Sequence, residues 1–143
     1  SAVHVAAGFG SPEIMAYLVG SGCNPSLGGS YGITPLHIAA LTQRVELVCC
    51  LLDLGANVNA TGLNMIQTPL HAACANMSTF TLDVVQALLH GGAALDIPND
   101  VGHTALLEVC KSRHCIASYV AAMLLDAGAD KYACREERTP LQV

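Results

Sequence analysis

Apolar residues recur along this chain in short runs with helical spacing, and each run stops at a glycine. From Val45 to Leu52 the apolar side chains fall three and four positions apart. Gly55 follows where a helix commonly ends in a glycine with left-handed backbone conformation. Before this run, Thr34 and Pro35 suit the cap and first turn of another helix, because Thr accepts a backbone N–H and Pro lacks one. The pattern predicts a pair of short helices, at 34–42 and 45–54.

The same pattern returns at intervals of 33 to 36 residues. The start of the first helix is repeated as Ser1-Ala2-Val3-His4, Thr34-Pro35-Leu36-His37, Thr68-Pro69-Leu70-His71, Thr104-Ala105-Leu106-Leu107 and Thr139-Pro140-Leu141-Gln142. The glycine after the second helix keeps the same interval, at Gly22, Gly55, Gly92 and Gly128. Because two independent markers stay in phase, the sequence indicates a tandem array of helix–helix units.

The markers divide the chain into four units and the start of a fifth. The units cover about residues 1–33, 34–67, 68–103 and 104–138, and residues 139–143 begin the next. Further helices are expected near 68–76, 82–91, 104–112 and 116–127. Residues rich in Asn, Gly and Thr follow each pair, which predicts an extended turn or hairpin there. The expected fold class is all-α, a solenoid of helix-turn-helix units with projecting connections and almost no sheet.

These motifs resemble the ankyrin repeat family. The family pattern has a Thr-Pro-Leu-His start, two small residues, an apolar second helix and a Gly-Ala-x-Val-Asn end, and it is matched best between Thr34 and Asn59. The resemblance covers essentially the whole chain. It implies an L-shaped cross-section, with helix pairs stacked side by side and connections, called fingers, projecting from one edge. It also implies that partners bind the finger tips and the exposed side of each first helix.

By motif position, that implied partner-binding surface contains eleven residues. The finger residues are Tyr31, Ile33, Met65, Gln67, Val101, His103 and Arg138, and the first-helix residues are Leu41, Thr42, Asn76 and Lys111. Several are apolar, and apolar side chains that gather on a surface mark interaction sites. The alternative is that the finger side chains pack against one another and serve only the scaffold.

Units three and four carry three extra residues between their helices. The distance from the starting Thr to the closing Gly is 21 positions from Thr34 to Gly55, but 24 in both later units. The additions fall around 76–80 and 112–116. Insertions in solenoids map to loops on one face. They are either a simple elongation of the loop or a second contact surface.

Composition limits the classes of function. A chain with 52% hydrophobic and 12% charged residues is not disordered. Its net charge is -5, and residues 1–99 hold five acids against the single base Arg44, which excludes the basic stripe of a nucleic-acid-binding protein. The longest apolar stretch, Cys115 to Leu125, is shorter than the roughly 20 residues of a membrane span. No nucleic acid and no direct membrane insertion are expected.

Groups capable of catalysis or metal binding lack the spacing that their chemistry needs. His37 and His71 lie one repeat apart, but a zinc site would require further ligands. The family resemblance implies instead that each imidazole bonds backbone between fingers. Cys110, His114 and Cys115 have no matching second pair of ligands. Nucleotide-binding and nucleophile-elbow motifs are absent from the sequence, so no enzyme activity, cofactor or metal is expected.

One family feature concerns covalent modification. Some ankyrin repeats are hydroxylated at the Asn of a Val-Asn pair, and Val58-Asn59 after the Leu51-Leu52 helix matches that context. Asn59 is therefore a possible hydroxylation site. The alternative is a finger Asn that bonds local backbone.

These features favour a non-catalytic protein-interaction module within a larger intracellular protein, cytoplasmic or nuclear, whose partner the sequence does not name. The inserted loops, the Glu108-Val109-Cys110 segment and the abundant Cys also resemble ankyrin proteins with a suppressor-of-cytokine-signalling box. That likeness implies substrate recognition for a ubiquitin ligase, whose components would bind a segment after Val143. The alternative is a structural spacer or membrane-skeleton adaptor, in which the array only sets distance.

The seven cysteines are expected to be unbridged thiols, because their number is odd and a core of this size needs no disulfide. Alkylation of the denatured protein without reductant, followed by mass analysis, should modify all seven. Several native disulfides in freshly purified protein would contradict the intracellular assignment.

Overall fold

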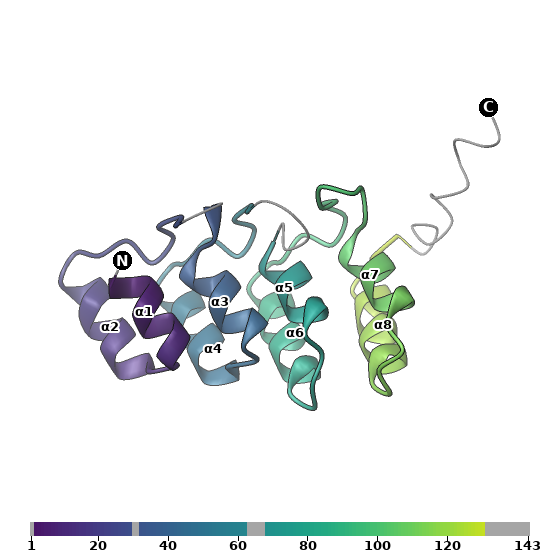
Figure 1. Cartoon of the computed structure of the whole chain (residues 1–143), viewed down its shortest axis with the longest axis horizontal. Coiled ribbons are helices and arrows are strands. Elements are labelled where there is room, and N and C mark those ends of the chain that lie inside the picture. The colour runs from purple at the N-terminus through teal and green to yellow at the C-terminus, as the bar shows by residue number, and fades with distance from the viewer. Residues whose placement is uncertain (1, 30–31, 63–67, 131–143) are drawn as a thin grey trace.

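A computed structural model gives the fold and describes residues 2–29, 32–62 and 68–130. Over these residues the chain forms eight α-helices: α1 (Ala2–Phe9), α2 (Pro12–Gly20), α3 (Pro35–Leu41), α4 (Val45–Asp53), α5 (Pro69–Ala75), α6 (Thr81–His90), α7 (Ala105–Lys111) and α8 (Ala117–Asp126). Figure 1 shows the helix pairs standing side by side, with the connections between pairs along one edge. The all-α solenoid is confirmed, and the six predicted helices each begin and end within one residue of the expected range.

The start of each first helix is set by its own sequence. Thr34 Oγ1 accepts the backbone N–H of His37 at 3.4 Å, and His37 Nδ1 accepts the backbone N–H of Thr34 at 3.1 Å, which closes a capping box. Thr68 and Thr104 accept the corresponding N–H groups of the third helical residue at 3.3 Å. Because the cap is made by residues three positions apart, the helix start is predictable from the repeat alone.

Small residues in the first helices allow the units to pack closely. The paired alanines at 6–7, 39–40 and 72–73 are buried, five of them with no exposed surface. The second helices contribute Leu and Val side chains, including Leu47, Leu51, Val84, Leu88, Val120 and Leu124, which are almost fully buried. These residues form one continuous apolar cluster through all four pairs. The core is therefore shared between units rather than enclosed by any one of them.

Imidazole groups join successive units on the finger side. His4 Nε2 lies 2.8 Å from the Ile33 carbonyl oxygen, and His71 Nε2 lies 2.9 Å from that of His103. Both carbonyls belong to the residue before the Thr that starts the next first helix. His71 also contacts Thr68 Oγ1 through Nδ1 at 2.9 Å. The expectation that the motif His bonds backbone between fingers is confirmed at His71.

A second series of hydrogen bonds joins the units beyond the ends of the second helices. One side chain of each unit accepts a backbone N–H of the next: Ser26 from Asn57 at 2.8 Å, Asn59 from Ala94 at 2.7 Å and Asp96 from Asp130 at 3.3 Å. The three acceptors occupy the same repeat position. Ser, Asn and Asp each carry a side-chain oxygen that can accept this backbone N–H, so the hydrogen bond is kept although the residue type changes.

The first unit exposes apolar side chains at positions that later units bury. Ile14 is 53% exposed, whereas Leu47, Val84 and Val120 at the same place in α4, α6 and α8 are at most 1% exposed. Tyr17, one helical turn further along α2, is 74% exposed. In the later units these positions are covered by the preceding pair. The outer face of α1 and α2 therefore exposes apolar side chains at positions that the later units use to pack against a preceding helix pair.

Gln43 ties the turn between α3 and α4 to the inserted loop of unit three. Its φ is +60°, a region that costs a non-glycine residue free energy. Its side chain compensates by donating to the carbonyls of Ala40 at 3.0 Å and Ala73 at 3.1 Å and accepting from Thr81 Oγ1 at 2.8 Å. Gln43 is 9% exposed. The inserted loop is thus held from a neighbouring unit.

Burial gives the array a pH dependence through His71. Burial lowers the pKa of His71 below its ordinary value, outweighing the bond to His103 and the charge of Glu108, which act in the opposite direction. The ordinary histidine pKa is about 6.5, and the pKa of His71 in the folded chain is lower. Between these two pKa values the unfolded chain binds more protons than the folded chain, so the free energy of unfolding falls as the pH falls. His71→Gln should cost about 1–3 kcal/mol near pH 7, and that deficit should shrink by about pH 5. Denaturant titrations at several pH values measure it, and a pH-independent deficit would contradict the assignment.

The bond between Gln43 and Thr81 should couple units two and three energetically. Gln43→Ala and Thr81→Val are each expected to destabilise the array, and the double variant should lose less than the sum by about 0.5–3 kcal/mol. A double-mutant cycle of unfolding free energies tests this. Strict additivity would mean that the two side chains act independently.

Candidate protein-binding surface

Seven of the eleven predicted partner-binding residues fall within the part of the chain that the structure describes. Tyr31, Met65, Gln67 and Arg138 lie outside the described residues. The other seven form what we call the finger surface: Ile33, Leu41, Thr42, Asn76, Val101, His103 and Lys111. Of these, Val101, Thr42, Asn76 and Lys111 are exposed, whereas Ile33, Leu41 and His103 are half-buried. The structure thus leaves some of them open to a partner and gives others packing contacts.

The finger of unit three, which precedes α7, presents Val101 on a firmly bonded turn. The Asn99 side chain is almost buried, and its Oδ1 accepts backbone N–H groups from Val101 at 3.1 Å and His103 at 2.9 Å. The backbone closes the same turn through Asn99 N to the His103 carbonyl at 2.9 Å, and Gly102 takes φ +84°. Val101 is 55% exposed at the tip. An exposed apolar side chain on a preformed turn loses little conformational entropy when a partner covers it.

His103 and Lys111 are brought together beside this finger. His103 Nδ1 lies 2.7 Å from Glu108 Oε1, and Lys111 Nζ lies 3.2 Å from His103 Nε2. Asn99 Nδ2 donates to the same Glu108 oxygen at 3.2 Å. Since an ammonium can only donate, Nε2 accepts from Lys111 and Nδ1–H donates to Glu108. The cluster places a cation and a carboxylate next to Val101, which suits polar recognition at the edge of an apolar contact.

Other predicted residues already use their polar groups within the scaffold. Asn76 Nδ2 donates to the Leu41 carbonyl at 3.0 Å and so bonds unit three to unit two. Thr42 Oγ1 donates to the Ile38 carbonyl of its own helix at 2.8 Å. Leu41 packs against the core cluster. A partner at these positions meets a surface whose hydrogen bonds are partly used.

Asn59 is held between two units. Its Oδ1 accepts from Ala94 N at 2.7 Å, its Nδ2 donates to the Gly92 carbonyl at 3.4 Å, and its own N–H bonds Asn57 Oδ1 at 3.0 Å. Both ends of the amide side chain are used, and Asn59 is half-buried. Hydroxylation of Asn59 remains a proposal, and it would require this connection to open.

The buried thiols are held in their protonated form, and the described residues form no metal cluster. Burial, with the charge of Glu108 adding to it, raises the pKa of the Cys74 thiol to about 12, and burial also raises that of Cys50. Such thiols stay protonated and unreactive. No group of three or more His, Cys, Asp or Glu side chains in the described part could hold a metal ion. None of the described helices has the length and apolarity to cross a membrane.

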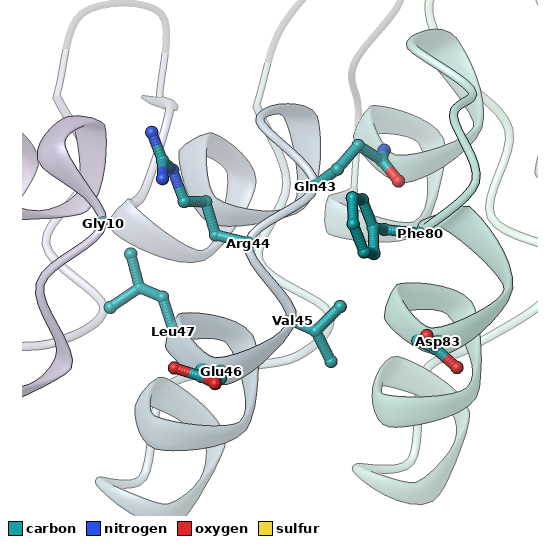
Figure 2. Close-up of a pocket in the computed structure, with 8 residues that line it drawn as sticks. All are labelled: Gly10, Gln43, Arg44, Val45, Glu46, Leu47, Phe80 and Asp83. Atoms are coloured by element: carbon teal, nitrogen blue, oxygen red, sulfur yellow. The ribbon is translucent and has the colours of Figure 1, made fainter.

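A groove that was not predicted from the sequence lies on the side of the turns between helices. It has a volume of about 440 Å³ and is lined by Gly10, Gln43, Arg44, Val45, Glu46, Leu47, Phe80 and Asp83; we call it the loop groove. Figure 2 shows Phe80 and Asp83 on one side of it, at the start of α6, and Val45 and Glu46 on α4. Phe80 is 57% exposed. The available signal was the three-residue insertion, since Phe80 lies within it.

Comparison with known proteins agrees with this architecture. A family model described as ankyrin repeats in three copies matches residues 1–62, and an ankyrin repeat model matches residues 67–100. Mouse ankyrin repeat and SOCS box protein 11 is 37% identical over 134 residues, which cover 90% of this chain and 37% of that protein. Human ankyrin repeat and SOCS box protein 16 is 32% identical over 99% of this chain and 32% of its own length.

A zebrafish (Danio rerio) protein named putative palmitoyltransferase ZDHHC13 is 37% identical over 73% of this chain but only 16% of its own length. The chain thus spans well under half of each of these three relatives. What they share with it is the repeat array. Since both family models match on the helix pairs that the structure shows, the chain belongs to the ankyrin repeat family.

Proposed function

We propose that this array is a non-catalytic recognition module that binds a protein partner through its finger surface. Ankyrin repeats are protein-interaction modules, although some relatives, such as the one named a putative palmitoyltransferase, carry the array beside other activities. The observation that carries the proposal is the finger of unit three together with the first helix of unit four. It combines exposed Val101 on a bonded turn with the cluster of His103, Glu108 and Lys111. We also propose an intracellular location, cytoplasmic or nuclear.

Binding and folding should be separable at this finger. Val101→Ala combined with Lys111→Ala should weaken partner binding about tenfold or more, because removal of an interface anchor commonly costs over 1 kcal/mol. Both side chains are exposed, so stability should change by only about 0.5 kcal/mol per substitution. Affinity capture from cell extract with the wild-type chain identifies the partner, and titration with each variant measures the loss.

The matched control is Tyr119→Ala, which removes a 66% exposed aromatic side chain from α8. Its binding should equal that of the wild type. If the finger variant stays folded and binds its captured partner as before, recognition lies outside the finger surface. If it unfolds, Val101 and Lys111 belong to the packing between units.

The more specific proposal is that the parent protein recognises substrates for a ubiquitin ligase. Two relatives that align with 90% and 99% of this chain are named as ankyrin repeat and SOCS box proteins. The array would then hold the substrate, and ligase components would bind a segment after Val143. The parent sequence tests this directly, since a short helical box should follow within one repeat of Val143. Many additional in-phase repeats instead would favour a structural spacer or membrane-skeleton adaptor.

A further inference from the structure

The loop groove is built mainly by units two and three, with Gly10 of unit one also lining it, and it has a rigid wall. Phe80 is the residue before α6, and its loop is fixed by the bonds from Ser78 N to Thr81 Oγ1 at 2.7 Å and from Phe80 N to Ser78 Oγ at 3.2 Å. Thr81 is in turn bonded to Gln43 of unit two at 2.8 Å. Phe80 is therefore held in place while more than half of its surface faces solvent. An exposed aromatic ring on a fixed backbone suits the centre of a contact.

Acidic groups line the same groove. Asp83 lies three residues after Phe80, so both side chains face the same side of the first turn of α6, as Figure 2 shows. Glu46 stands opposite on α4. Both carboxylates are exposed, and among the described residues neither has a salt-bridge partner.

The one basic residue of the groove lies apart from these carboxylates. Figure 2 shows the Arg44 side chain directed away from Phe80, toward Gly10. Any side chain at Gly10 would collide with Arg44, so the Arg44 stem packs on the glycine. The end of the groove that Phe80 and Asp83 form is left with negative charge only. Glu13 and Asp53, on α2 and α4, add acidic groups to the second-helix side of the array.

We propose that the loop groove binds an arginine-containing segment of a partner protein, with the guanidinium stacked on the Phe80 ring and paired with Asp83. An aromatic face next to a carboxylate matches guanidinium, which is planar, attracted to ring faces and able to donate two parallel hydrogen bonds. The lysine ammonium is also attracted to ring faces, but it is not planar and cannot donate two parallel hydrogen bonds in a fixed fork. Val45 and the rest of the Phe80 ring would cover apolar atoms flanking the arginine. This inference deepens the proposed function by adding a second contact surface, on the inserted loop.

Selection of a phage-displayed random peptide library on the intact chain tests the chemistry. Enriched peptides should be rich in arginine next to an apolar residue, and they should bind less tightly as salt is raised, because the carboxylates are exposed. In titrations with a synthesised enriched peptide, Phe80→Ala and Asp83→Asn should each weaken binding about tenfold or more. Replacing the peptide arginine by lysine should weaken it to a similar degree. Phe80→Leu, which keeps an apolar side chain, should still lose the preference for arginine.

The controls are Tyr119→Ala and Asp53→Asn, which remove an exposed aromatic ring and a second-helix carboxylate outside the groove and should leave peptide affinity unchanged. Circular dichroism confirms that each variant keeps its helices. The proposal is overturned if no peptide is enriched, if the enriched peptides lack arginine, or if they bind Phe80→Ala as tightly as the wild type. Peptides lost with the Val101 and Lys111 variant but not with Phe80→Ala would leave the finger surface as the recognition site and remove the loop groove.

Discussion

The array depends on one constraint, which is that a pair of helices of seven to ten residues cannot bury its apolar face alone. Each unit must stack on the next, and the spacing has to suit every unit at once. Alanine pairs in the first helices make a close approach possible, and two series of side-chain bonds fix it. Imidazoles such as His71 join successive units on the finger side. The side chain at the position of Asn59 joins them beyond the ends of the second helices. The chemistry of recognition is added to this scaffold at positions that the stacking does not use.

Most of the fold was predictable because its determinants are local and repeated. The cap formed by Thr34 and His37 involves residues three positions apart, so the helix start follows from a tetrapeptide. Four copies of the pattern then reduce the error of any single one. The bonds between units were not predictable in the same way. Gln43 replaces a glycine of unit one, and nothing in its neighbours shows that its side chain reaches Ala73 and Thr81 from a left-handed backbone. That contact exists only once the units are stacked.

The candidate surface was only partly predictable, for a related reason. Motif position places a residue on the finger or the first helix, but it does not show whether a neighbouring unit already uses the polar group. Asn76 and Asn59 are both exposed or half-exposed by position, yet both make bonds to the adjacent unit. Val101 has an apolar side chain with no such use, and it stays open at the tip of its turn. Phe80 lies in an insertion that the sequence shows plainly. Its orientation depends on Gln43, which belongs to another unit.

The finger surface and the loop groove lie on opposite sides of the array. Each unit contacts only its neighbours, which limits how strongly a change at one surface affects the other. The open part of the finger surface is formed by the finger of unit three and the first helix of unit four, whereas the loop groove is formed by turns of units one to three. In a solenoid, the effect of a substitution on stability becomes smaller with each interface between units that separates it from the residue considered. Val101 belongs to the same unit as Phe80 and can couple to it within that unit, whereas Lys111 of unit four reaches Phe80 only through the interface between units three and four. A scaffold of this kind can keep its stacking positions constant while each edge takes up its own partner.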